Sequence, residues 1–458
     1  MTATTPDHDV AALTGPLLDW SASVDFDDLP AEVVHAARRA VIDSLGVTLG
    51  GSQTEATTIL LDLADELSGA PVATVVGHRR RVDVVTATMV NGVSAHVLDF
   101  DDTLIPTRIH ASAPLLPALL AVGQTQGSTY RDLLAAFVVG FELQARLALA
   151  MYPDYADRGW HGTSVVAPMA VATAAGRLLR LDPGRLAHAA GLGITQGAGI
   201  TAVFGSMAKS LNLGRAGASG VQGALLAARG FTSNPAALEA GKGFFSRYSN
   251  VLDTEALLGD LGTRWAVLED GFKPYACGLV AHAAIDGVLN LRRRTGFVPD
   301  DIEGIHLRVP PESLVLMGIR SPTTELEAKF SVAYAAAAAY LDGSAGPDSF
   351  ADERVADSRY RNLTSKVTVE GDAAIRQDES FVTVRGRGES HETHVEHALG
   401  TLRQPMTDDD LIAKFTSLAA PVIGDTSTVD LARRLWRLDH EPVSDLTTTL
   451  QPTEEAAP

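Results

Sequence analysis

The sequence predicts a mainly α-helical protein, with a large all-helical domain and a smaller α+β domain. Up to about residue 265 the apolar residues recur at helical spacing, and few segments alternate with period two. Beyond that point three segments alternate as half-buried strands do, with helical patterns around them. We therefore place the all-helical domain at residues 1–265, completed by residues 400–458, and the smaller α+β domain at residues 266–399.

The helices of the first half carry recognisable start signals. An Asp-Leu-Pro sequence at 28–30 precedes a helical pattern that ends at Gly46, and an Asp-Pro pair at 182–183 opens another helix. Asp caps the free N–H groups of a first turn, and Pro fits the position after the cap. Residues 133–152 are the most apolar segment, but a Glu and an Arg in mid-span favour a buried helix over a membrane span.

The second half contains the predicted strands. Three segments alternate in the manner of strands: 302–310, 365–372 and 379–388. Between the first two, residues 327–343 form a continuous helical pattern. A late helix is expected to begin at Thr407, which can cap a first turn rich in Asp, and residues 446–458 are expected to form a frayed tail.

The composition argues against several classes of partner. The chain has 458 residues and a formal net charge of −19 at pH 7, whereas nucleic acid and anionic membranes need a basic face. Cys277 is the only cysteine, so an intrachain disulfide and a four-Cys zinc site are excluded. The N-terminal residues lack the basic and apolar regions of a signal peptide, and we expect a cytoplasmic protein.

Lysine is rare in this chain, so each lysine in an apolar setting is worth noting. Only six of the 37 Lys and Arg residues are Lys. Lys209 lies among glycines, and Lys273 precedes a Pro-Tyr pair. Together with Arg215 they are candidate cations for an anionic substrate.

The stretch HVLDFDDTLIPTRIHAS combines imidazole, carboxylate and hydroxyl groups. His96 and His110 flank Asp99 and Thr103, and His161 lies further on between glycine and tryptophan. Because His titrates near working pH, these groups predict acid–base chemistry on carbon. No H-x-x-x-H or H-E-x-x-H spacing occurs, and we predict neither a metal nor an organic cofactor.

The same stretch leaves a second hypothesis open. D-F-D-D-T-L resembles the nucleophile loop of haloacid-dehalogenase-type phosphatases, in which Asp99 would attack a phosphoryl group beside Mg²⁺. That loop follows a buried parallel strand of an α/β fold, but the preceding TATMVNGVSAHV has the composition of a helix. A Mg²⁺-dependent phosphatase therefore stays a remote alternative.

Six segments, in this order along the chain, are similar to those of the MmgE/PrpD family. They are NGVSAHVLDFDDT, IHASAPLLPALLA, GWHGTS, MAKSLNLGRAGASG, FKPYACGLVAH and ELEAKFSVAYAAAA. The family includes 2-methylcitrate dehydratases, cis-aconitate decarboxylases and iminodisuccinate epimerases. The resemblance implies a homodimer without metal or organic cofactor, a small carboxylate substrate, and a site at the domain boundary.

The resemblance also implies residue roles. Six residues fall on the family's active-site positions: Asp99, Thr103, His110, His161, Lys209 and Lys273. The two lysines would hold substrate carboxylates, the two histidines would act as acid and base in either order, and Thr103 would bind substrate. Asp99 would orient a histidine or accept a proton. His96 and Arg215 are added as substrate-binding candidates.

Three departures bear on the reaction. The family often has His where this chain has Asn212, and cis-aconitate decarboxylases have a His where it has Gly278 and a Tyr near Leu316 or Met317. The sequence therefore favours a 2-methylcitrate-dehydratase-like lyase acting on a small di- or tricarboxylate. An epimerase or isomerase and a cis-aconitate-type decarboxylase are the alternatives within the family.

Overall fold

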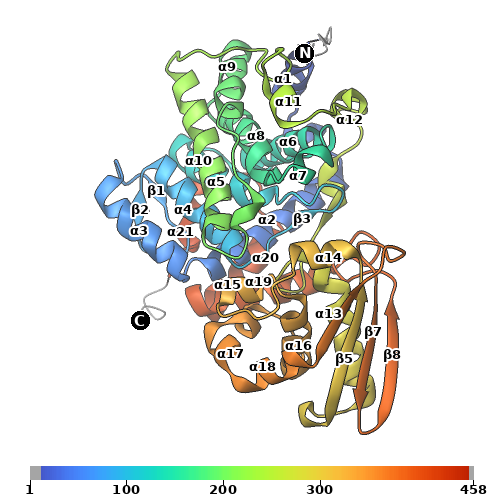
Figure 1. The fold of residues 1–458 in the computed structure, drawn as a ribbon. Coiled ribbons are helices and arrows are strands. Elements are labelled where there is room, and N and C mark those ends of the chain that lie inside the picture. The colour runs from blue at the N-terminus through green and yellow to red at the C-terminus, as the bar shows by residue number, and fades with distance from the viewer. Residues whose placement is uncertain (1–11, 453–458) are drawn as a thin grey trace, which may run out of the picture.

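Helices make up most of the structure, a computed structural model that describes residues 12–452. Figure 1 shows the helical part in the upper portion of the view and the smaller part, with its sheet, below it. The longer helices of the first part are α1 (Thr14–Ser23), α2 (Ala31–Gly51), α3 (Glu55–Leu67), α4 (Val84–Val97), α5 (Ser112–Gln126), α6 (Tyr130–Leu149), α8 (Gly162–Leu178), α9 (Pro183–Ile194) and α10 (Ala208–Ala228). Its short helices are α7 (Asp154–Asp157), α11 (Phe244–Tyr248) and α12 (Thr254–Leu258).

The C-terminal helices return to this first part. They are α19 (Asp408–Ile423), α20 (Asp425–Leu435) and α21 (Val443–Thr449). α19 packs along α2, and α21 packs against α5. Residues 13–272 and 406–450 therefore share one apolar core.

The smaller part is built on a four-stranded mixed sheet of order β6-β5-β7-β8, in which only the β5–β6 pair is parallel. Its strands are β5 (Ile302–Val309), β6 (Val367–Gly371), β7 (Ser380–Gly386) and β8 (Glu389–Val395). Its helices are α13 (His282–Thr295), α14 (Pro311–Leu316), α15 (Glu325–Ala328), α16 (Val332–Asp342), α17 (Asp352–Ala356) and α18 (Ser358–Ser365). α13 packs on β7 and β8, and α16 packs on β6. The predicted mainly α fold with a smaller α+β part is confirmed.

Two short antiparallel pairs complete the strands of the described residues. β1 (Ala73–Thr74) pairs with β2 (Arg81–Val82) before α4, and β3 (Thr103–Leu104) pairs with β4 (Asp270–Gly271). The second pair joins the loop after α4 to the segment that leads into the smaller part.

Two predicted helix starts are confirmed by their hydrogen bonds, whereas Asp28 does not cap α2, which begins after Pro30, and accepts instead from the Asp25 N–H. Asp182 accepts from the Arg185 backbone N–H at the start of α9, and Thr407 forms a capping box at the start of α19. In α6 the Arg146 guanidinium donates to Glu142 at 2.6 Å, so the two mid-span charges form a buried pair. No helix within residues 12–452 has the length and apolar character that a membrane crossing requires.

The helix predicted to end at Gly46 continues to Gly51, which corrects the sequence expectation. A Cβ added at Gly46 would lie 3.1 Å from the Cα atom of Phe415 in α19. Gly46 therefore permits close packing between α2 and α19, and it does not stop the helix.

Three further expectations need correction in the second half. The helix predicted over 327–343 is interrupted between α15 and α16, because the Ser331 hydroxyl caps a new helix at the Tyr334 N–H. The strand β8 was not predicted. The predicted tail begins inside α21, where Leu446 is buried, and only its residues 453–458 lie outside the described part of the chain.

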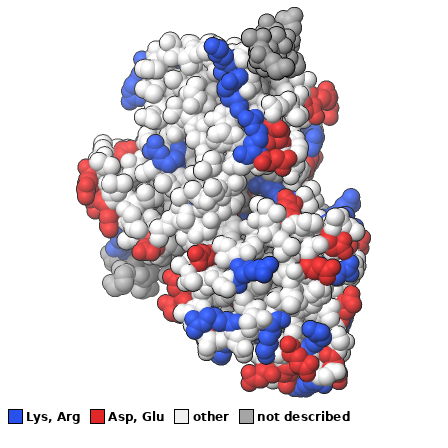
Figure 2. Space-filling model, viewed as in Figure 1, with Lys and Arg blue, Asp and Glu red and all other residues white. Residues whose placement is uncertain are grey.

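Charge is unevenly spread over the face seen in Figure 2. Lys, Arg, Asp and Glu side chains of both signs are interspersed over the smaller part, whereas few occur over the helical part around α5 and α10. One run of Lys and Arg side chains crosses the upper, helical part of this face and ends beside acidic side chains.

Candidate active site

Three segments meet where the helical part contacts the smaller part. They are the end of α4 with its following loop, the first turn of α10, and the loop after β4. The pairing of Thr103 with Gly271 in β3–β4 brings the third segment beside the first. Lys273, which is distant in sequence, thereby reaches the Asp99 carboxylate.

Asp99 holds two lysines on one carboxylate oxygen. Its Oδ1 accepts from Lys273 Nζ at 2.6 Å and from Lys209 Nζ at 3.1 Å. The Asp99 backbone is left-handed, with φ of 50°, which turns the chain sharply after α4. Burial alone would raise the pKa of Asp99, but the two ammonium charges hold it well below its usual value.

The two ammonium groups differ in their environment. Burial lowers the pKa of Lys209, against the opposing charge of Asp99. Burial also acts to lower the pKa of Lys273, but the Asp99 and Asp101 carboxylates raise it above the usual value. The raised pKa keeps Lys273 charged at neutral pH, and the ion pair with Asp99 favours the charged form of Lys209 within an almost fully buried site.

His96 connects Lys209 to Asp101. The ammonium group of Lys209 lies 2.7 Å from His96 Nε2, and His96 Nδ1 lies 2.7 Å from Asp101 Oδ2. Because an ammonium group only donates, Nε2 accepts and the ring proton is on Nδ1. Burial and the Lys209 charge hold the His96 pKa well below its usual value, so this ring is a neutral link.

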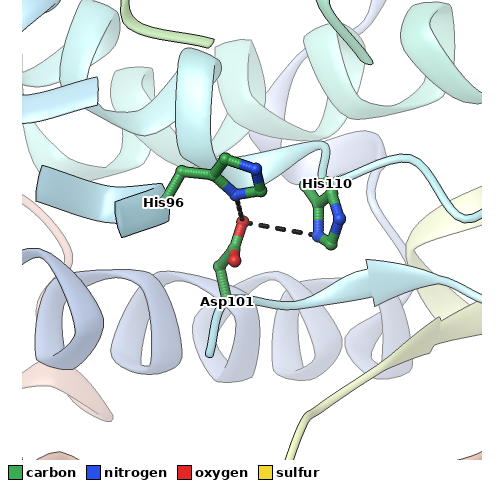
Figure 3. A group of neighbouring side chains, drawn as sticks. All are labelled: His96, Asp101 and His110. Carbon is green, nitrogen blue, oxygen red and sulfur yellow. Dashed lines mark hydrogen bonds and ion pairs between the residues drawn. The ribbon is translucent and has the colours of Figure 1, made fainter. Parts of the chain in front are cut away.

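His110 carries its proton on the same nitrogen. Its Nδ1 lies 2.9 Å from the backbone oxygen of Asp102 and 3.4 Å from Asp101 Oδ2, and a carbonyl oxygen only accepts. Figure 3 shows the Asp101 carboxylate between the rings of His96 and His110. Burial lowers the His110 pKa well below its usual value, and the free lone pair is on Nε2.

His96, Asp101 and His110 also have the spacing of a possible metal site, since one ligand atom from each lies within 4.8 Å of the others. The nitrogens involved are the Nδ1 atoms of the two rings. The hydrogen bonds above place protons on both, whereas a metal ligand needs the lone pair free. The arrangement therefore fits a proton network better than a metal centre.

His161 completes the set of rings. It lies at the start of α8, where its backbone N–H donates to Gly199 O at 3.0 Å. The ring packs edge-on against Phe204, with centroids 5.0 Å apart, and its centroid lies 5.9 Å from that of His96. Burial, together with the nearby Lys209 charge and the His96 ring, holds the pKa of His161 well below the usual value, so His161 is neutral.

Two buried carboxyl groups lie behind the loop. Burial raises the pKa of Asp102 to about 7, although hydrogen bonds with Asp270 and Ser112 act to lower it. Burial and the neighbouring Asp102 carboxyl raise the pKa of Asp270 well above its usual value. A single proton held between the two carboxyl groups would remove their repulsion. Because Asp102 adjoins β3 and Asp270 begins β4, the pair fastens together the two segments that carry Asp99 and Lys273.

The pocket among these groups has walls from both parts of the molecule. Its lining residues are His96, Val97, Asp99, Gly205, Ser206, Lys209, Ser210, Leu326, Lys329 and Phe330. The rings of Phe204 and Phe330 lie 5.4 and 5.6 Å from Lys209 Nζ. The cavity is about 10 Å³, which is room for about one water molecule.

The structure brings most of the predicted site residues together. The residues that lie in this cluster are His96, Asp99, Thr103, His110, His161, Lys209 and Lys273. Arg215 does not join them, which corrects its prediction as a substrate-binding residue. It follows Lys209 by six positions, about 240° around the helix, and is exposed.

The sequence reasoning missed several residues that the structure places here. Neither Asp101 nor the two phenylalanines, Phe204 and Phe330, was predicted from the sequence as a site residue. Lys329 lines the pocket with 1% exposure, and its rarity as a lysine was the one available signal. Cys277 is fully buried, and burial raises the pKa of its thiol far above the usual value.

The phosphatase alternative is contradicted by the elements around Asp99. The residue follows helix α4 and not a parallel strand, and its Oδ1 is engaged by Lys209 and Lys273. A phosphoryl-attacking carboxylate needs that oxygen free beside a metal.

Two of the noted departures touch each other. A Cβ added at Gly278 would lie 2.7 Å from Met317 Sδ, and Met317 is 1% exposed. The thioether therefore occupies the space that a side chain at position 278 would need. Gly278 and Met317 act as one apolar contact next to the backbone of Lys329.

Comparison with known proteins gives matches along most of the chain. Residues 16–256 match the MmgE/PrpD N-terminal domain, and residues 275–438 match the MmgE/PrpD C-terminal domain. A cis-aconitate decarboxylase from Mus musculus is 29% identical over 440 residues, which cover 92% of this chain and 89% of the relative. One from Homo sapiens is 29% identical, covering 92% and 91%, and one from Aspergillus terreus is 25% identical, covering 94% of both.

Proposed function

Because the chain belongs to the MmgE/PrpD family, we propose that it is a lyase that removes CO₂ from cis-aconitate or a close tricarboxylate. The curated relatives above are named for that activity. The observation that carries the proposal is the Asp99 carboxylate held between the ammonium groups of Lys209 and Lys273, beside neutral imidazoles. The chemistry uses only side chains of this chain.

The reaction needs fixed cations and one proton. When CO₂ leaves from the methylene carboxylate, the bonding pair forms a new C=C bond. The former π pair moves to the carbon beside another carboxylate, and that carbon must then take a proton. Each turnover thus consumes one proton and yields CO₂ and a dicarboxylate. Charge that develops on the remaining carboxylate is stabilised by ammonium groups in a dry site.

Lys209 and Lys273 can supply that stabilisation without releasing Asp99. An ammonium group has three N–H donors. Among the described residues, Lys209 uses two on Asp99 and His96, and Lys273 uses two on the side chain and backbone of Asp99. One donor on each lysine stays available for a substrate carboxylate.

The second candidate is dehydration of a 2-methylcitrate-like substrate, which the Gly278–Met317 contact favours. The decarboxylases of the family have polar His and Tyr groups at these places, whereas this chain has an apolar contact. Dehydration needs a base for the α-proton and an acid for the leaving hydroxyl. The free Nε2 of His110 suits the base, and His161 is available as the acid.

Substrate access requires the two parts of the molecule to separate. A tricarboxylate has more than ten heavy atoms, but the cavity of about 10 Å³ holds about one water molecule. Leu326, Lys329 and Phe330 close it from the smaller part. We therefore assign the described conformation to the closed state, in which the site excludes water during reaction.

One incubation distinguishes the candidate reactions. The protein, freed of metal by a chelator, is mixed in D₂O with cis-aconitate, 2-methylcitrate, citrate or iminodisuccinate and followed by ¹H NMR. The proposal expects loss of cis-aconitate with release of CO₂ and one deuterium in the product. Turnover of 2-methylcitrate without CO₂ supports the second candidate, and deuterium exchange without net loss indicates an epimerase. Strict dependence on Mg²⁺ in every reaction would contradict both proposals.

A further inference from the structure

The start of α10 makes two contacts with the site, and only that of Lys209 is used by the proposed chemistry. Asn212 follows one turn later and projects from the same side of the helix. Its side-chain amide nitrogen lies 3.2 Å from Nδ1 of His161. α10 thus positions an ammonium group against His96 and an amide against His161.

The Asn212 side chain is held in this place by its surroundings. A Cβ added at Gly199 would lie 3.1 Å from Asn212 Cγ and 2.3 Å from Ser164 Oγ, and Gly199 has φ of 115°, a conformation that favours glycine. The same Gly199 accepts the backbone N–H of His161. One glycine therefore fixes both partners of the Asn212–His161 contact.

The contact determines which ring nitrogen carries the proton. An amide nitrogen only donates, so Nδ1 of His161 must accept and the neutral ring must carry its proton on Nε2. We propose that Asn212 is a positioning residue that keeps His161 in the Nε2–H tautomer, from which that proton can pass to the substrate carbon. The imidazolate that remains accepts the Asn212 N–H at Nδ1 and regains its Nε2 proton from solvent before the next turnover. The assignment of His161 as the acid rests on the proposed function, whereas its tautomer does not.

The two histidines then have opposite tautomers. His110 donates from Nδ1 to a carbonyl and presents a bare Nε2, whereas His161 presents Nε2–H. The charged and titratable groups that face His161 are His96, Lys209 and Asp99. Both rings are neutral, so one site holds an acid and a base at the same pH. Decarboxylation uses the acid alone, and dehydration uses both.

The tautomer can be read in the unmodified protein. Histidine labelled with ¹⁵N is incorporated, two-bond ¹H–¹⁵N correlations are recorded between pH 6 and 8, and His161 is assigned by its loss in His161→Gln. We expect a protonated Nε2 and an unprotonated Nδ1. A protonated Nδ1 would overturn the inference, whether or not any substrate is turned over.

Variants of Asn212 test its role in catalysis. In Asn212→Asp the carboxylate accepts from Nδ1, so the tautomer should reverse and turnover should fall by about 10²-fold. Asn212→Ala should leave His161 in a mixture of tautomers. Turnover should fall less than in Asn212→Asp, and the pH profile of kcat/KM should change. Gln222→Ala, an exposed amide on the same helix, is the control.

The outcomes separate the inference from the proposed function. An unchanged His161 tautomer in Asn212→Asp contradicts the role of Asn212. If the protein shows the expected tautomers but turns over none of the four carboxylates, the positioning role of Asn212 is supported. The proposed lyase activity is then contradicted.

Discussion

At the scale of single residues, the site depends on buried charges that neutralise one another. Asp99, Lys209 and Lys273 are each at most 7% exposed. Charges are tolerated in such surroundings only when they are paired and hydrogen-bonded. The same groups that would bind substrate therefore also hold the loop after α4 in place.

Removing one ammonium group should abolish most activity and leave the fold intact. In Lys209→Ala, turnover of the preferred carboxylate is expected to fall by about 10²–10³-fold, because a fixed donor to the developing charge is lost. Steady-state kinetics measure the effect, and circular dichroism checks the fold. Lys242→Ala, at an exposed lysine, should behave as the unmodified protein. Equal activity of both variants would contradict the site.

Neutralising the shared carboxylate should destabilise the protein. Asp99→Asn keeps the side-chain shape and a residue type that tolerates φ of 50°. It leaves two buried ammonium groups without their counter-charge, at an expected cost of about 3 kcal/mol in the free energy of unfolding. Urea denaturation measures this cost. A loss of unfolding free energy smaller than that of typical surface variants would show that Asp99 does not stabilise the two buried ammonium groups.

Single residues were predictable where the sequence itself brings them together. His96, Asp99 and His110 share one stretch, and the family resemblance added Lys209 and Lys273. Asp101 was not predicted, because neighbouring carboxylates in a loop point in different directions. Which of them faces an imidazole depends on the fold of that loop and not on its spacing.

At the scale of elements, the site depends on close helix packing between α4, which carries His96, and α10, which carries Lys209. Gly92 of α4 and Gly214 of α10 lie against each other: a Cβ added at Gly92 would lie 2.9 Å from the Gly214 Cα. Small residues at this crossing let the two backbones approach, so the side chains beyond it can meet at hydrogen-bond distance.

Adding one methyl group at this crossing should disturb both stability and activity. In Gly214→Ala the new Cβ would lie 2.4 Å from the Met89 carbonyl oxygen, so the helices must move apart. We expect a loss of about 2 kcal/mol in unfolding free energy, together with reduced turnover as Lys209 shifts from His96. Gly241→Ala, where no atom lies within 4 Å of the added Cβ, is the control. Wild-type activity and stability in Gly214→Ala would refute the role of the crossing.

The predictions of helices and strands were wrong where the local sequence pattern and the tertiary packing favour different structures. β5 and β7 were predicted because apolar residues alternate along them. β8 was missed because its outer residues are Glu and His, as suits an edge strand that avoids pairing with other molecules. The break at Ser331 was missed because strong helix formers lie on both sides of it, in residues 325–329 and in the alanines of 335–339.

At the scale of the whole molecule, the Asp102–Asp270 pair joins the two parts and makes stability depend on pH. Asp102 has a pKa of about 7 in the folded state, against a reference value of 3.8. Between these values the folded state keeps a proton that the unfolded state has released. The stabilisation of the folded state by this retained proton is complete below about pH 4 and is lost as pH rises through about 7.

Asp102→Asn should flatten that dependence. Unfolding free energy of the unmodified protein is expected to fall between pH 5 and pH 8, and the variant should show a smaller difference. Urea denaturation at the two pH values measures it, with Asp62→Asn, on the exposed side of α3, as the control for charge. An equal pH slope in the variant and the unmodified protein would contradict the shared proton.

The arrangement of the whole molecule was only partly predictable. Composition and periodicity indicated a helical part and an α+β part, because each pattern is local. The meeting of Lys273 with Asp99 depends on the β3–β4 pairing, which involves two residues from each strand. A pairing that short leaves no readable signal in the sequence.

Because the chain has few lysines, their acylation can report how often the active site opens. Of the six lysines, Lys209, Lys273, Lys329 and Lys414 are at most 7% exposed, Lys366 is half-buried, and only Lys242 is exposed. A short pulse of an amine-acylating reagent should mark Lys242 first. Acylation of Lys209 or Lys329, read by mass spectrometry of peptides, would then count the molecules whose site was open during the pulse.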